Sequence, residues 1–243
     1  MIIKRKAVLK EAPPLIGTEI AVYVDGVPTE KTDGFMFRIT RVALPSTSKS
    51  FTIEWGDGLS EKFYATASEL KHTYSRIGLY RIRLCDGISN VAVSSASGTS
   101  AYGIYAPMLR EFRTTSTKIH TIARTAFLNA CNLERLELRG SAVRTIAVGS
   151  FAGCSSLKSL EGCEQIEKLY GTAFDGAVSL PEKVYLPNLY DIQAPVTSSP
   201  FHGTNIKEFH FAAKHEEAIK SLPIYTESGG NLGVEGAVCV FDL

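Results

Sequence analysis

Four phenylalanines recur at a nearly constant spacing in the second half of the chain. They end the segments TAF, GSF, TAF and SPF, at Phe127, Phe151, Phe174 and Phe201. The intervals are 24 (127 to 151), 23 (151 to 174) and 27 (174 to 201) residues. A period in the twenties predicts a solenoid, because each repeat is one structural unit that buries its apolar side only by stacking on the next.

Apolar and small residues hold fixed offsets within these repeats. The clearest repeat contains Leu133, Leu136, Leu138, Val143, Ile146, Phe151, Cys154 and Leu157. The next contains Leu157, Leu160, Cys163, Ile166, Leu169, Phe174, Ala177 and Leu180. The unit L-x-x-L-x-L-x4-V-x-x-I-x4-F-x-x-C-x-x-L resembles the BspA-type leucine-rich repeat of bacterial surface proteins over roughly residues 104–211. The resemblance implies a leucine-rich-repeat solenoid of about four to five turns.

The ends of the repeat array depart from this pattern. The fourth repeat carries the insertion QAPVTSS before Phe201. Beyond Phe209, the segment AAKHEEAIKSL predicts a short helix stopped by Pro223, and GAVCVFDL predicts a last strand. We expect residues from about 212 to 243 to cap the end of the core, which would otherwise be an unpaired edge.

The first 94 residues show short β-rich runs that end at turn residues. The runs EIAVYV, GFMFRITRVAL, FTIEW and LYRIRL predict a small antiparallel β-sandwich. The segments IEWGDG, HTY and GLYRIRL resemble the PKD-type module over residues 35–93. Residues 94–103, SSASGTSAYG, predict a boundary between domains of residues 1–94 and 95–243. The expected fold is mainly β, with a PKD- or Ig-like sandwich followed by a leucine-rich-repeat solenoid and a C-terminal helix and strand cap.

The WGDG turn raises the question of catalysis. His72 and Asp57 could act as a base and its orienting carboxylate, with Ser75 as the nucleophile of a hydrolase. The PKD resemblance implies a structural alternative, in which Asp57 hydrogen-bonds the turn backbone and Trp55 fills the space between two sheets. We favour the structural interpretation, so the sequence predicts no catalytic residue and no enzyme.

Composition and spacing argue against several kinds of partner and site. The chain has 26 basic and 25 acidic residues, so a net charge of +1 provides no overall field to attract nucleic acid or a membrane. No apolar run has the position of a secretory signal or the length of a membrane span. The five cysteines form no C-x-x-C pair and are expected to be reduced. No cofactor or metal is predicted, since the H-E-x-x-H spacing is absent among His210, His215, Glu216 and Glu217.

Residues at one offset of successive coils become cross-strand neighbours about 4.8 Å apart. Two such columns avoid like-charged neighbours and predict the stacking register. The first contains Arg110, Glu134, Lys158, Glu182 and Lys207. The second contains Glu111, Arg135, Ser159, Lys183 and Glu208. A third column changes its chemistry from coil to coil: Arg113, Glu137, Glu161, Tyr185 and His210. A mixed polar and aromatic strip is typical of surfaces that bind sugars or proteins. We therefore expect this column to form a continuous exposed ligand-binding strip. The alternative is an ordinary solvated face of the sheet, since exposed residues need no function.

The combination of a sandwich with a repeat surface resembles adhesion and recognition proteins. It implies a non-enzymatic protein that binds a glycan or a protein through the sheet face of the solenoid, with an extracellular or cell-surface location. Because the chain shows no signal peptide, the location stays open. The alternative is a structural or receptor-binding component of a phage or prophage particle, whose partners are other components of the assembly and which leaves the cell by lysis.

Overall fold

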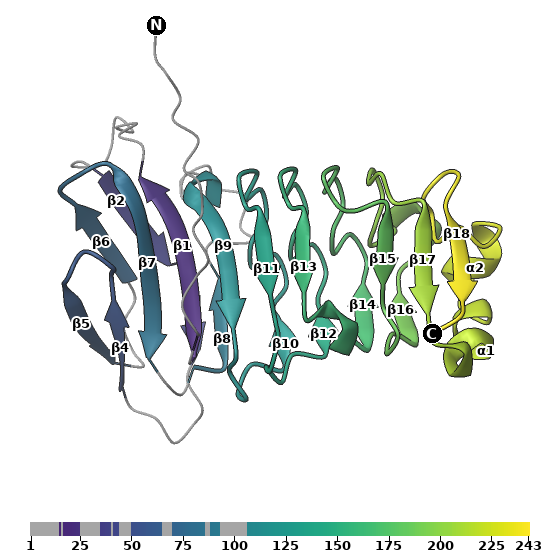
Figure 1. The fold of residues 1–243 in the computed structure, drawn as a ribbon, viewed down its shortest axis with the longest axis horizontal. Helices are drawn as coiled ribbons and strands as arrows, with labels where there is room; N and C mark the ends of the chain where they lie inside the picture. The colour runs from purple at the N-terminus through teal and green to yellow at the C-terminus, as the bar shows by residue number, and fades with distance from the viewer. Residues whose placement is uncertain are drawn as a thin grey trace, which may run out of the picture.

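The computed structural model describes residue 15 and residues 17–24, 35–39, 41–43, 50–64, 70–85, 88–92 and 106–243. These residues form an elongated molecule in which successive coils stack from the N-terminal strands to two short C-terminal helices (Figure 1). Most of the regular structure is β-strand. The expected mainly β fold with a solenoid is confirmed.

The coils of the solenoid contribute strands to two parallel sheets, and the last two front strands have no counterpart in the back sheet. The front sheet contains β9 (Leu109–Thr114), β11 (Arg135–Glu137), β13 (Ser159–Glu161), β15 (Lys183–Tyr185), β17 (Glu208–Phe211) and β18 (Val238–Phe241). The back sheet, on another side of the core, contains β10 (Thr121–Ile122), β12 (Thr145–Ile146), β14 (Lys168–Tyr170) and β16 (Asp191–Gln193). Short 3-10 helices connect some of these strands: η1 (Ala106–Met108), η2 (Cys163–Gln165), η3 (Val196–Ser198) and η4 (Ala213–His215).

The repeating phenylalanines stack along the core of the solenoid. The ring centroids of Phe127 and Phe151 lie 5.3 Å apart, as do those of Phe151 and Phe174. The rings of Phe174 and Phe201 follow at 5.7 Å, and all four side chains are buried. Each coil therefore places one aromatic ring in the core, which is why the phenylalanine spacing in the sequence reports the length of a coil.

The N-terminal half joins the solenoid through a strand at its first edge. β1 (Thr18–Val24) pairs antiparallel with β9 on one side and with β7 (Gly78–Cys85) on the other. One sheet therefore runs in the order β13-β11-β9-β1-β7-β4-β5, with β4 at Ser50–Glu54 and β5 at Ser60–Tyr64. The pairing satisfies backbone groups that an open first coil would expose. The predicted domain boundary after residue 94 lies outside the described residues.

The WGDG turn packs against β6 (Leu70–Tyr74), which pairs antiparallel with β2 (Phe35–Ile39). Two further short strands, β3 (Arg41–Ala43) and β8 (Asn90–Ala92), pair with each other. Much of residues 1–105 lies outside the described residues, so the PKD-type sandwich stays a prediction.

Contacts of the WGDG turn are those of a folding element. The Trp55 ring is fully buried and stacks on the His72 imidazole, with centroids 4.9 Å apart. Asp57 accepts a backbone hydrogen bond within the turn and lies 2.7 Å from His72 Nε2. The other ring nitrogen of His72 faces Glu61 Oε1 at 3.3 Å, so neither nitrogen is directed at Ser75. The turn is thereby tied to β6, as the structural interpretation predicts.

The front sheet is interrupted between its third and fourth coils. β13 and β15 do not pair, although both are described, whereas β14 and β16 pair normally in the back sheet. The third repeat is one residue shorter than the second, and the chain turns into η2 directly after β13. Gly162 makes this turn at φ 77°, where an added Cβ would lie 2.4 Å from the backbone nitrogen of Arg139. The interruption divides the front sheet into a first half (β9, β11, β13) and a second half (β15, β17, β18).

The C-terminal residues close the end of the core. The helices α1 (Glu216–Lys220) and α2 (Pro223–Glu227) bury Ile219 and Ile224 in the same core as the coils. β18 completes the front sheet by pairing with β17. The expected helix and strand cap is present. Pro223 does more than stop the first helix, because it begins α2, where its missing N–H costs no intrahelical hydrogen bond.

Candidate recognition surface

The front-sheet strands stack in the register that the charge columns predict. Arg113, Glu137 and Glu161 lie side by side in the first half, and Tyr185 lies opposite His210 in the second half. In the neighbouring column, opposite charges pair across coils: Glu134 with Lys158, and Glu182 with Lys207. Within each half the predicted register is confirmed. Across the interruption, no strand pairing joins the two halves of the column.

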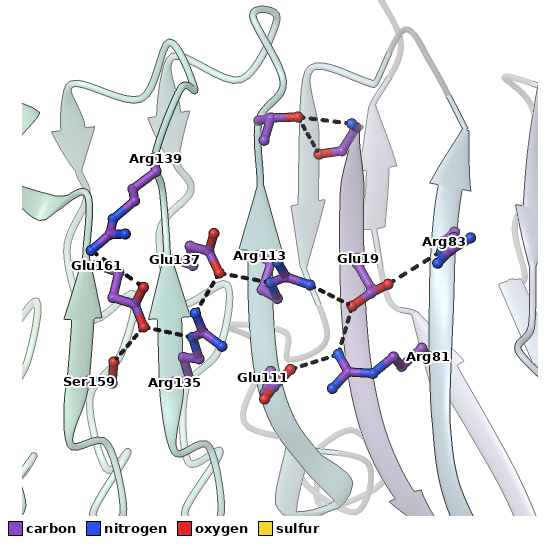
Figure 2. Close-up of polar contacts among 12 residues, drawn as sticks. Glu19, Arg81, Arg83, Glu111, Arg113, Arg135, Glu137, Arg139, Ser159 and Glu161 are labelled. Carbon is purple, nitrogen blue, oxygen red and sulfur yellow. Dashed lines mark hydrogen bonds and ion pairs between the residues drawn. The ribbon is translucent and has the colours of Figure 1, made fainter. Parts of the chain in front are cut away.

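In the first half, outward side chains form a network of ion pairs centred on Glu19 of β1 (Figure 2). The Glu19 Oε1 atom lies 2.7 Å from Arg81 Nη1 and 3.2 Å from Arg113 Nη1. Its other oxygen, Oε2, lies 3.3 Å from Arg83 Nε. Arg81 also contacts Glu111 Oε2 at 2.8 Å. These ion pairs therefore link the side chains of β7, β1 and β9, which the backbone hydrogen bonds of the sheet already join.

The same network continues into the coils. Arg113 Nε lies 2.8 Å from Glu137 Oε2, and Arg135 contacts Glu137 at 2.9 Å and Glu161 at 2.8 Å. Burial raises the pKa of Glu161, but the hydrogen bond and the charge of Arg135 outweigh it, so the pKa lies below its ordinary value. The carboxylates of this half are thus compensated by arginines of the protein itself.

The strip predicted from the third column is not continuously exposed. Arg113 is 4% exposed and His210 is 8% exposed, because partners from neighbouring strands surround each of them. Glu137 and Glu161 are half-buried in the ion-pair network, whereas Tyr185 is 48% exposed. The expectation of exposure is wrong at both ends of the column and correct at Tyr185. Ligand binding by these residues stays a prediction.

The second half of the front sheet is built around the Tyr185 ring. This ring stacks on the His210 imidazole, with centroids 4.7 Å apart and planes 22° apart. His210 Nδ1 lies 3.1 Å from Asp242 Oδ1, and Nε2 lies 3.0 Å from Glu208 Oε2. Because ionised carboxylates only accept hydrogen bonds, both contacts are satisfied when both ring nitrogens donate, so this arrangement favours the protonated imidazolium. The hydrogen bond to Asp242, together with that to Glu208, raises the pKa of His210 against the opposing effect of burial.

The last strand supplies residues to this surface that the sequence analysis missed. Val240 lies opposite His210 in the sheet, and Val238 is exposed on the same side of β18. Asp242 follows the strand and holds His210. The signal was present in GAVCVFDL, because alternate residues of a strand face opposite sides and valine and aspartate occupy every second position.

The other candidate ligands and the described thiols lie at separate positions along the solenoid. Among the described residues, no group of three or more histidine, cysteine, aspartate and glutamate side chains is suited to hold a metal ion. His215 packs near the Tyr190 ring, at 5.7 Å between centroids, whereas His210 is held on β17. The cysteines with described side chains are free thiols: Cys131, Cys154, Cys163 and Cys239. Burial raises the pKa of Cys154 to about 12, which disfavours the reactive thiolate.

Residues 105–196 match the protein-family model described as a BspA type leucine rich repeat region, in six copies. These residues are a BspA-type leucine-rich-repeat region. The BspA-type region begins just before β9 and extends through β16. It includes the first half of the front sheet and β15 with Tyr185, while β17 and β18 follow it in the chain.

Solved structures with some similarity to this chain include three bacterial proteins. A leucine-rich repeat protein from Bacteroides ovatus is 16% identical, covers 57% of this chain and 37% of its own, and has a TM-score of 0.34. The pneumococcal vaccine antigen PcpA is 14% identical to this chain. The match covers 55% of this chain and 42% of PcpA, with a TM-score of 0.37. A leucine rich cell surface protein from Faecalibacterium prausnitzii is 16% identical to this chain. The match covers 68% of this chain and 47% of that protein, with a TM-score of 0.36. This chain therefore spans less than half the length of these three proteins.

A search of curated proteins gives no significant match. In the part of the chain that the structure describes, none of the helices has the length and apolar character needed to cross a membrane.

Proposed function

We propose that the chain is a non-enzymatic recognition protein that binds a glycan or a protein through the second half of its front sheet. The observation that supports this most is the Tyr185 side chain, which is half-exposed and yet held in place by stacking on His210. Binding energy concentrates at aromatic anchors of this kind, especially where rigid elements position them. The first half of the sheet satisfies its charges internally, which leaves the second half as the better surface for a partner.

The setting we propose is adhesion at a bacterial surface, because the BspA-type repeat is typical of bacterial surface proteins. Stacked repeats form a stiff, extended platform that suits contact with a large partner. No feature of the described residues specifically favours the phage-particle alternative or a hydrolase.

The test begins with a ligand search by glycan array and by pull-down from host-cell surface extracts, using the full chain. The affinity of any ligand is then compared for Tyr185→Ala and Lys158→Ala. Loss of the aromatic anchor should cost at least about 2 kcal/mol of binding free energy. Lys158 is the control, because its exposed side chain pairs with Glu134 at the edge of the first half. Equal affinities of the two variants would contradict the proposal.

A further inference from the structure

The surroundings of Tyr185 select a chemical class of ligand. His210 covers one face of the tyrosine ring, and the side chain is still half-exposed, so the opposite face is turned to solvent. Within residues 106–243, His210 is the only aromatic partner of this ring. β13, whose Glu161 would otherwise be the next neighbour in the column, does not pair with β15. The free face of the ring therefore lies at the interruption of the sheet.

The charged groups around this ring pair with one another. The His210 imidazolium stacks on the covered face, and the Lys183 ammonium belongs to the same strand as Tyr185. A cation on one face of an aromatic ring draws on the same electron density that would attract a second cation to the other face. The carboxylates nearby are already paired, Glu208 with Lys183 at 2.9 Å and Asp242 with His210. Neither carboxylate is therefore left free to attract a basic side chain or a quaternary ammonium group to the free face.

We propose that the free face of Tyr185 stacks against an uncharged pyranose ring, so that the ligand is a neutral glycan. The inference rests on the proposed recognition function. The C–H groups on one side of a pyranose make van der Waals contact with an aromatic face without carrying a full charge. Its hydroxyl groups both donate and accept hydrogen bonds, which suits the exposed Lys183 ammonium and Asp242 carboxylate at the rim. An apolar peptide side chain offers no such hydrogen bonds to the rim groups.

Saturation-transfer difference NMR reads out the ligand class directly. The probes are a panel of neutral methyl glycosides and, in parallel, lysine amide and arginine amide. We expect saturation to reach ring C–H protons of the glycosides and not the two amides. Tyr185→Phe keeps the stacking face and should keep binding, whereas Tyr185→Ala should weaken it by about thirtyfold or more. Tyr190→Ala is the matched control, because Tyr190 is also an exposed tyrosine but lies beside β16 of the back sheet.

The possible outcomes separate the two proposals. Glycoside binding that survives Tyr185→Ala, or a preference for the basic amides, overturns the sugar assignment. If no glycoside binds but a host protein binds in a manner that depends on Tyr185, the sugar assignment fails and the recognition function stands. If neither sugar nor protein binding depends on Tyr185, both proposals fail. Because Tyr185 is exposed, the variants are expected to fold, and thermal unfolding of each variant checks this.

Discussion

Glu19 is the acidic residue of the buried strand β1, and its side chain is 1% exposed. An ionised carboxylate is costly to bury unless cations and hydrogen bonds replace the lost water. Three arginines from the neighbouring strands take that role: Arg81, Arg83 and Arg113. Burial lowers the pKa of Arg113, but its hydrogen bonds and charge interactions with Glu137 and Glu19 outweigh it, so the pKa is raised. The network is stable only while both signs of charge are present.

Removal of the Glu19 charge should therefore destabilise the join between β1 and its neighbours. We expect Glu19→Gln to lower the free energy of unfolding by about 1.5 to 3 kcal/mol, since it removes a charged hydrogen-bond partner from Arg81 and Arg113, which keep Glu111 and Glu137. The control is Glu134→Gln, which breaks a partly exposed pair with Lys158 and should cost about 0 to 1 kcal/mol. Urea unfolding of both variants measures the difference. A loss below about 1 kcal/mol for Glu19→Gln would contradict the role assigned to the network.

His210 should make the C-terminal end of the front sheet sensitive to pH. Its pKa is raised in the folded protein, chiefly by the hydrogen bond to Asp242. Protonation therefore favours the folded state: the full contribution is present below the unfolded pKa of about 6.5 and is lost as pH rises through the raised folded pKa. An NMR titration of the His210 ring should show a midpoint above about 6.5, and Asp242→Asn should lower it. A midpoint that Asp242→Asn leaves unchanged would refute this assignment.

The turn between β13 and η2 is the element that interrupts the front sheet. Gly162 at this turn has a positive φ, and its backbone approaches that of Leu138 and Arg139 in the preceding coil. Gly140 follows β11 and has a similar φ of 73°, but an added Cβ there would meet nothing within 4 Å. A substitution at Gly140 therefore changes stability through the backbone conformation alone. A substitution at Gly162 adds the effect of close packing between coils.

Substitution at these two glycines should have unequal effects. Gly140→Ala should cost about 1 kcal/mol of stability, because a side chain disfavours the left-handed conformation. Gly162→Ala should cost this amount and a further ~1 to 3 kcal/mol, because the new methyl group overlaps the backbone of the preceding coil. Thermal or urea unfolding compares the variants. Similar losses at the two positions would show that the coils do not approach each other as closely as described.

Periodic elements could be predicted from the sequence, and contacts between distant segments could not. The phenylalanine spacing located each coil, and the charge columns gave the register within each half of the front sheet. Glu19 meets Arg113 across a separation of 94 residues, for which the sequence contains no periodic signal. The burial of Arg113 follows from that contact, so the expected exposed strip failed there. Asp242 and Val238 were missed because the last strand was considered only as a cap.

The whole molecule places two different surfaces along one solenoid. Near the N-terminal strands, the first half of the front sheet continues through β1 into β7 and is covered by paired charges (Figure 2). Beyond the interruption, the second half combines the half-exposed Tyr185 with exposed Val238 and a buried imidazolium. The paired charges of the first half stabilise the junction of the two parts of the chain. The second half, near the C-terminal cap (Figure 1), is left as the surface for recognition.

Hydrogen–deuterium exchange with a bound ligand tests this division most directly. The ligand is the glycan or host protein retained in the array or pull-down, and exchange is measured on the full chain with and without it. We expect slower exchange of backbone amides in Lys183–Tyr185, Glu208–Phe211 and Val238–Phe241, with the back sheet and the first half of the front sheet unchanged. Slower exchange confined to the first half or to the back sheet would contradict recognition through the Tyr185 surface.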